Sequence, residues 1–71
     1  MRLMRIEQAM VYVLVTSGRG MTAMDIARYI NDERLHVRYD GEPVSDRQIY
    51  AVACRNNQIF VREGGLIRLL M

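Results

Sequence analysis

The segment from Val44 to Asn57 constrains the fold most, because its first residues specify where a helix begins. Ser45 and Gln48 have the spacing of a capping box, in which the hydroxyl accepts from the Gln48 N–H and the Gln48 side chain accepts from the Ser45 N–H. Val44, just before the cap, is placed to pack on Ile49 as a hydrophobic staple. We therefore expect a helix that begins at this cap and runs through most of the segment.

The two sides of this expected helix differ in chemistry. Residues at i, i+3, i+4 and i+7 form a face suited to a core: Ile49, Val52, Ala53 and Asn56. The other side carries Arg47, Tyr50, Ala51 and Cys54, with Arg55 at its edge. This second side is suited to a partner outside the domain, and the sequence leaves nucleic acid and protein open.

The length of the chain limits how its core can be stabilised. We interpret residues 1–71 as a single domain, or as a piece cut from a longer chain, and a domain this small buries only about 60% of its unfolded surface. Cys54 is the only cysteine, so an internal disulfide is excluded, and one cysteine with one histidine cannot make a structural zinc site. The core must come from the apolar residues, which are 51% of the chain, and dimerisation would add to it. We expect no cofactor and no metal.

Apolar runs in this chain are short. The longest, Ala9 to Val15, falls far below the ~20 residues of a membrane-spanning helix. The preceding segment from Met1 to Arg5 has only a faint likeness to a signal peptide, because Glu7 and Gln8 follow it and no small-residue cleavage site is present. We expect a cytoplasmic protein without membrane contact, and the unpaired cysteine agrees with a reducing compartment.

The basic residues are unusual in kind rather than in number. The formal net charge is only +2, yet all ten basic residues are arginine and none is lysine. The guanidinium group presents a planar fork of donors that suits phosphates and guanine edges. A codon bias towards arginine would produce the same composition. The charge therefore permits nucleic-acid binding without establishing it.

Residues 4–17 are predicted to form a first helix that ends at Gly18. Its core stripe consists of Ile6, Met10, Val13 and Leu14, with Ala9 beside it. Residues 10–15 have strand-like composition, so a strand is the alternative, although the length of the segment favours a helix. The apolar residues left outside the stripe are Val11, Tyr12 and Val15. They predict a surface for dimerisation or for a protein partner, or a place where a terminal segment packs.

A second helix is predicted to open at Thr22, which caps Asp25, with Met21 as its staple residue. Residues 19–21 form a short connection that has room for one strand-like residue pair. Residues 34–44 are the least regular part, and the Asp40-Gly41 pair predicts a turn within them. His36 is interpreted as a solvent-facing loop residue, because no partner for a ligand or a base lies at a useful spacing.

Two alternating apolar runs, residues 59–62 and 66–70, flank Glu63-Gly64-Gly65 and predict a β-hairpin. Phe60, Ile67 and Leu69 are expected to face the core, Arg68 to point to solvent and Arg62 to lie near the tip. The expected fold is α+β: a small winged helix-turn-helix, in which three helices are followed by a C-terminal β-hairpin wing.

Several segments resemble the HARE-type helix-turn-helix domains, a family of winged-helix modules. The resemblance covers residues 4–70 and rests on Met21-Thr22 with Asp25-Ile26-Ala27, residues 39–43, Gln48-Ile49-Tyr50-Ala51, Phe60-Val61 and the hairpin from Gly64 to Leu69. It implies a module of restriction-associated, regulatory or chromatin proteins that binds DNA or senses its modification. The chain departs from the family pattern at Tyr50 and Val52, where members carry basic residues, and at Asn56-Asn57, where they carry Tyr-Pro.

Binding of double-stranded DNA is the first functional hypothesis. The third helix would enter the major groove, with Arg47 on a phosphate or a guanine edge. The base-facing side would be lined by Tyr50, Ala51 and Cys54. The contacts to backbone phosphates would come from Arg55, Arg62 and Arg68. The alternative reading is that these arginines are solvated surface, paired with Asp46, Glu63 and their neighbours.

The second hypothesis is a winged helix that binds protein through the first helix. Salt-sensitive association with duplex DNA would support the first hypothesis, and dimerisation without DNA affinity would support the second. We do not expect an enzyme, because the carboxylates show no paired spacing and Gly18-Arg19-Gly20 lacks the rest of any phosphate-binding loop. Cys54 has no histidine placed to activate it.

Overall fold

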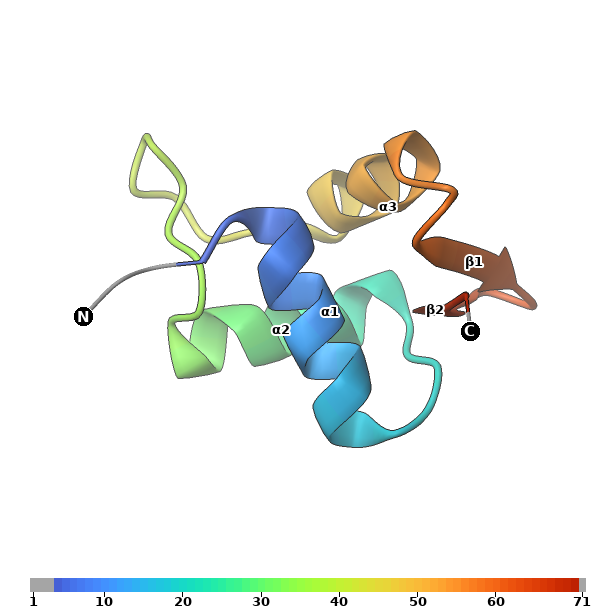
Figure 1. Cartoon of the computed structure of the whole chain (residues 1–71). Coiled ribbons are helices and arrows are strands. Elements are labelled where there is room, and N and C mark those ends of the chain that lie inside the picture. The colour runs from blue at the N-terminus through green and yellow to red at the C-terminus, as the bar shows by residue number, and fades with distance from the viewer. Residues whose placement is uncertain (1–3, 71) are drawn as a thin grey trace.

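The computed structural model describes residues 4–70 and contains three helices followed by a two-stranded antiparallel sheet. The elements in chain order are α1 (Ile6–Ser17), α2 (Ala23–Glu33), α3 (Asp46–Arg55), β1 (Phe60–Glu63) and β2 (Leu66–Leu69). The helices pack on one another, and the hairpin lies where the chain leaves α3 (Figure 1). This order confirms the predicted α+β layout of a winged helix.

Helix α1 begins slightly later than predicted, with Arg5 as its cap residue. The Arg5 N–H donates to Gln8 Oε1 at 3.1 Å, which satisfies one of the backbone donors at the helix start. The predicted end is confirmed: Gly18 adopts a φ of 71° and its N–H donates to Leu14 O at 3.0 Å. A residue with a side chain would be strained in this left-handed conformation, so glycine suits the position.

The hydroxyl caps of α2 and α3 form as the sequence predicted, but neither capping box is completed by a return bond. Thr22 Oγ1 accepts from the Asp25 N–H, and Ser45 Oγ accepts from the Gln48 N–H, both at 3.1 Å. The return bond of the α3 capping box is not formed, because Gln48 Oε1 is buried with no hydrogen-bond partner among the described residues. The cap therefore gives a hydrogen-bond partner to one unpaired backbone N–H group at the start of α3 rather than to two.

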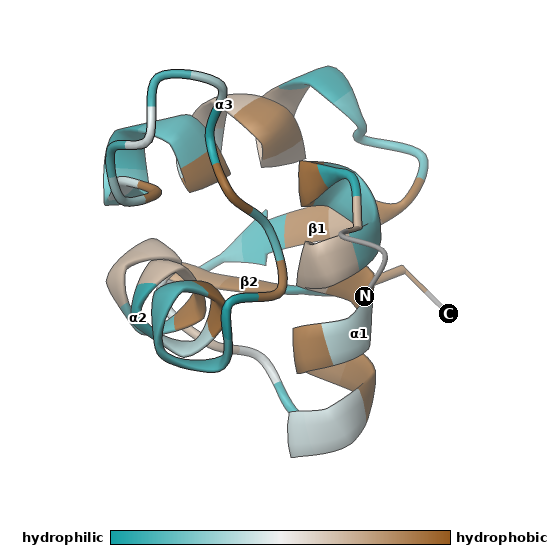
Figure 2. Ribbon diagram, turned by 90° about the vertical axis from the view of Figure 1, so that its left-hand side faces the viewer, coloured by the Kyte–Doolittle hydropathy of each residue, from teal (hydrophilic) through white to brown (hydrophobic). Residues whose placement is uncertain are grey.

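The core is built from all five elements and from the segment that precedes α3. Its buried members are Ala9, Met10, Val13, Leu14, Ile26, Ala27, Ile30, Val44, Ile49, Val52, Ala53, Phe60 and Ile67. Figure 2 shows brown, hydrophobic segments along much of α1, whereas α2 and the connection after it alternate between teal and brown. Val11, predicted to lie outside the core stripe, is half-buried and packs against this cluster. Tyr12 and Val15 are left exposed on α1.

Asn31 fixes the approach to α3. Its Nδ2 donates to Val44 O and its Oδ1 accepts from the Val44 N–H, each at 2.9 Å. These two bonds give the backbone of Val44 the partners that a neighbouring strand would otherwise supply. They tie α2 to the residue just before the cap of α3, and so set where α3 begins.

The connection between α1 and α2 adds a bridge to the sheet, which confirms the strand-like residue pair expected there. Met21 pairs with Ile67: the Met21 N–H donates to Ile67 O at 2.9 Å, and the Ile67 N–H donates to Met21 O at 2.7 Å. Gly20 approaches β2 closely, and a Cβ placed on it would lie 3.4 Å from the Cβ atoms of Leu66 and Arg68. The hairpin is thus joined to the helical part by backbone hydrogen bonds as well as by its core residues.

The α2–α3 connection, residues 34–45, contains no strand. The predicted turn is present, with Gly41 at a φ of 80° and its N–H donating to Arg38 O at 3.0 Å. The prediction that His36 faces solvent is wrong: the residue is half-buried, and its Nδ1 lies 2.8 Å from Met4 O. No helix among residues 4–70 has the length and apolarity needed to span a bilayer.

Candidate nucleic-acid interface

The outward face of α3 is the centre of the candidate site. Ile49, Val52 and Ala53 are buried against the core, which turns the opposite side of the helix outward. That side exposes Arg47, Tyr50, Cys54 and Arg55 and half-buries Ala51. The α3 residues predicted to form a binding surface therefore share one accessible face.

The two arginines of this face lie near the two ends of the helix. Arg47 and Arg55 are eight positions apart, which corresponds to about 12 Å along a helix axis. Within residues 4–70, neither side chain makes a hydrogen bond or an ion pair. Asp46, next to Arg47, is not paired with it. Both guanidinium groups are available to an external anion.

A third arginine reaches the same face from the hairpin. The Arg62 guanidinium donates a hydrogen bond to the Tyr50 hydroxyl, and its central carbon lies 4.9 Å from the centre of the Tyr50 ring. The contact combines a charge-assisted hydrogen bond with a cation–π interaction, so the ring orients the guanidinium. Arg62 is not paired with Glu63, although that neighbour was its expected partner in the alternative reading. The contact of Arg62 with Tyr50 instead joins the wing to α3.

A surface recess of about 260 Å³ lies beside this contact. It is lined by Tyr50 of α3, by hairpin residues 62–67 and by Ala23 at the start of α2. The turn can close tightly because Gly64 and Gly65 adopt φ values of 58° and 81°. The start of α2, the middle of α3 and the wing tip thus meet around one concave surface.

Arg68, also predicted to contact phosphate, lies elsewhere. It pairs with Val61 across the hairpin, whereas Arg62 pairs with Ile67. Since successive residues of a strand point to opposite faces, Arg62 shares the inner face with Ile67 and Arg68 lies on the outer face. Its Nε lies 3.3 Å from Glu63 Oε1. The structure brings the predicted α3 residues and Arg62 together and separates Arg68 from them.

Asn31, which positions the segment before α3, was not singled out from the sequence. An amide side chain at the end of an amphipathic helix is the signal that could have indicated it. Tyr50 was singled out as a base-facing residue, but its contact with Arg62 joins residues 12 positions apart and has no local signal. Among the described residues, no cluster of His, Cys, Asp and Glu side chains could hold a metal ion.

Comparisons of this chain with models of protein families, with curated proteins and with solved structures find no match.

Proposed function

We propose that this protein is a winged-helix module of the HARE type that binds double-stranded DNA and performs no catalysis. In this proposal α3 lies in the major groove and β1 contributes a wing contact. The observation that supports it most is the outward face of α3, with an unpaired arginine near each end and Arg62 oriented beside its middle.

The two α3 arginines lie near opposite ends of the helix, about 12 Å apart along its axis. A recognition helix lies in the major groove and is flanked by the two phosphate backbones, so side chains near its two ends can reach backbone phosphates. Ala51 and Cys54, small residues between them, allow the helix backbone to approach the base edges, and Ala51 offers an apolar contact for a thymine methyl group.

The electrostatics of the face predict modest, salt-sensitive affinity. Its positive groups are Arg47, Arg55 and Arg62, and the nearest carboxylate on α3 is Asp46. The other nearby carboxylate, Glu63, is engaged by Arg68 on the outer side of the hairpin. Three phosphate contacts correspond to a slope of about −2.7 for the logarithm of the binding constant against the logarithm of salt concentration.

A module of this kind suits transcription regulation or a restriction–modification system, where a small domain brings a larger assembly to DNA. The proposed role places the protein in the cytoplasm, where a single unpaired cysteine stays reduced.

The test is an NMR titration of the isotope-labelled chain with a short mixed-sequence duplex, first at low and then at moderate salt. We expect amide shifts on α3 and around Arg62 that fade as salt is raised. Arg47→Ala and Arg55→Ala should each lower the salt slope by about 0.9. Arg34→Ala, at the C-terminal end of α2, removes the same charge outside the proposed face and should leave the shifts of α3 in place. The absence of any shift at low salt would refute the proposal.

A further inference from the structure

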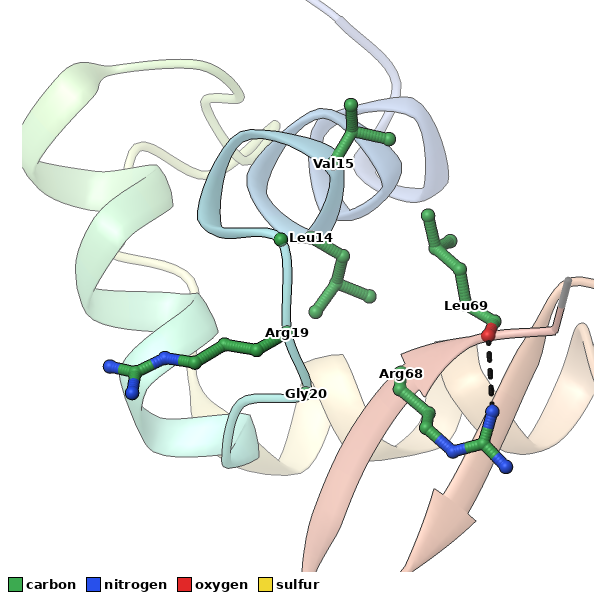
Figure 3. A pocket seen from close by; sticks show the side chains of 7 residues that line it. Leu14, Val15, Arg19, Gly20, Arg68 and Leu69 are labelled. Carbon is green, nitrogen blue, oxygen red and sulfur yellow. Dashed lines mark hydrogen bonds between the residues drawn. The ribbon is translucent and has the colours of Figure 1, made fainter.

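A second concave surface lies on a different part of the molecule. A hollow of about 320 Å³ is enclosed by the C-terminal end of α1, the α1–α2 connection and β2 (Figure 3). It is lined by Leu14, Val15, Gly18, Arg19, Gly20, Arg68 and Leu69. Its volume is near the lower end of the range for ligand pockets, about 300–1,000 Å³, so it suits one or two apolar side chains.

The walls of the hollow are apolar, and the apolar surface continues beyond it. Leu14 is buried and Leu69 half-buried, and Figure 3 shows these two side chains on either side of the hollow. Val15 at the rim is 62% exposed, and Tyr12, one turn earlier on the same side of α1, is 45% exposed. An occupant can therefore fill the hollow and also lie along α1, which favours a peptide segment over a small molecule.

The charges around the hollow are of one sign. Among residues 4–70, its charged lining residues are Arg19 and Arg68, and no side-chain carboxylate lines it. The Arg19 side chain makes no hydrogen bond or ion pair within residues 4–70. Arg68 contacts Glu63, but both side chains are exposed, at 45% and 70%, and surface ion pairs of this kind are weak enough for another carboxylate to compete. Figure 3 shows the side chains of Arg19 and Arg68 extending away from the hollow in opposite directions.

We infer that this hollow binds an acidic amphipathic segment of a partner protein. One branched apolar side chain of the partner enters between Leu14 and Leu69, and acidic residues on either side of it pair with Arg19 and Arg68. The surface is distinct from the candidate nucleic-acid interface, because none of its lining residues belongs to α3 or β1. The inference does not depend on DNA binding by α3.

The first experiment titrates the labelled full chain with a synthetic amphipathic peptide that carries leucine at every third or fourth position and glutamate elsewhere. The control peptide has lysine in place of each glutamate. We expect the glutamate peptide to shift the amides of Val15, Gly20 and Leu69, and the lysine peptide to leave them unchanged. Equal binding of both peptides, no shift at millimolar peptide, or shifts confined to α3 would overturn the inference.

Charge reversal then tests the two arginines. Arg19→Glu and Arg68→Glu should each weaken binding of the glutamate peptide about two- to fivefold, as expected for loss of an exposed ion pair. Arg47→Glu changes the net charge equally on α3 and should leave peptide affinity unchanged, while it weakens DNA binding if that proposal holds. All three residues are exposed, and amide dispersion in the NMR spectrum checks that each variant folds.

A second copy of the chain is the competing occupant. If the same amides shift with protein concentration in the absence of peptide, the hollow is a dimer surface and the inference is wrong. If Arg47→Glu weakens peptide binding as much as Arg68→Glu, general attraction between opposite charges accounts for the binding, and the hollow is not the site.

Discussion

Arg62 and Arg68 stand on paired strands of one hairpin, but their surroundings differ. Arg62 shares the inner face with Ile67 and contacts Tyr50 of α3. Arg68 shares the outer face with Val61 and lies at the hollow beside Val15. The residues were expected to act alike because both are arginines near the wing. The hairpin register instead assigns them to two different surfaces.

The difference shows how a domain this small can carry two surfaces. An isolated two-stranded hairpin is marginally stable, so its inner face must pack on the helices. Phe60 and Ile67 provide that packing, at 2% exposure each. The outer face contributes little to the core and leaves Arg68 available for a separate contact. The pleat of one strand pair therefore separates Arg62, at the proposed DNA surface, from Arg68, at the hollow, although Leu69 of the hollow lies on the inner face with Phe60.

The largest expected effect tests whether the inner face anchors the hairpin. Phe60→Ala should lower the free energy of unfolding by about 3–5 kcal/mol, because it leaves a cavity among buried side chains. That is a large share of the roughly 4–11 kcal/mol expected for a chain of this length. Val61→Ala, at the next position on the outer face, should cost much less. Urea unfolding followed by circular dichroism measures both, and equal losses would contradict the distinction between the faces.

The next effect concerns DNA affinity. Arg62→Ala should weaken binding to duplex DNA several-fold and reduce the salt slope by about 0.9, because one phosphate contact is lost. Arg68→Ala removes the same charge from the outer face and should change the slope little. Fluorescence anisotropy of a labelled duplex across a salt series compares the two variants. If Arg68→Ala has the larger effect, the outer face is the DNA surface.

Much of the fold was predictable because its determinants are local. Ser45 and Thr22 cap their helices as their sequence spacing indicated, and Gly18 ends α1. Alternation placed Phe60 and Ile67 on the buried face of the hairpin. In each of these cases the relevant partners lie within one turn of helix or follow the two-residue repeat of a strand.

The remaining features depend on contacts between distant parts of the chain. Asn31 reaches Val44, and His36 reaches Met4, so periodicity within one segment could not reveal either contact. The same limit applies to the candidate site. The exposed face of α3 followed from its own pattern, whereas the orientation of Arg62 depends on how the hairpin packs against Tyr50.

A smaller effect tests how Tyr50 orients the wing arginine. Tyr50→Phe removes the hydroxyl that accepts from Arg62 and keeps the aromatic ring, so the cation–π contact remains. DNA affinity should fall about twofold, since a single exposed hydrogen bond contributes near the low end of about 0.5–1.5 kcal/mol. Anisotropy measurements in the Arg62→Ala background provide the control, because the substitution should have no further effect once the arginine is absent.

The smallest expected effect is that of the outer ion pair. Glu63→Gln removes the charge that Arg68 contacts at 3.3 Å, and unfolding free energy should change by less than about 0.5 kcal/mol, because both side chains are exposed. The substitution also removes a negative charge next to Arg62, so DNA affinity should rise slightly at low salt and not at high salt, where charges are screened.

Glu63→Gln frees Arg68 as well, and the glutamate peptide should bind at least as tightly as before. A loss of peptide affinity would mean that the pair with Glu63 holds Arg68 in the position that binds the peptide. Arg68 would then not exchange Glu63 for a carboxylate of the partner.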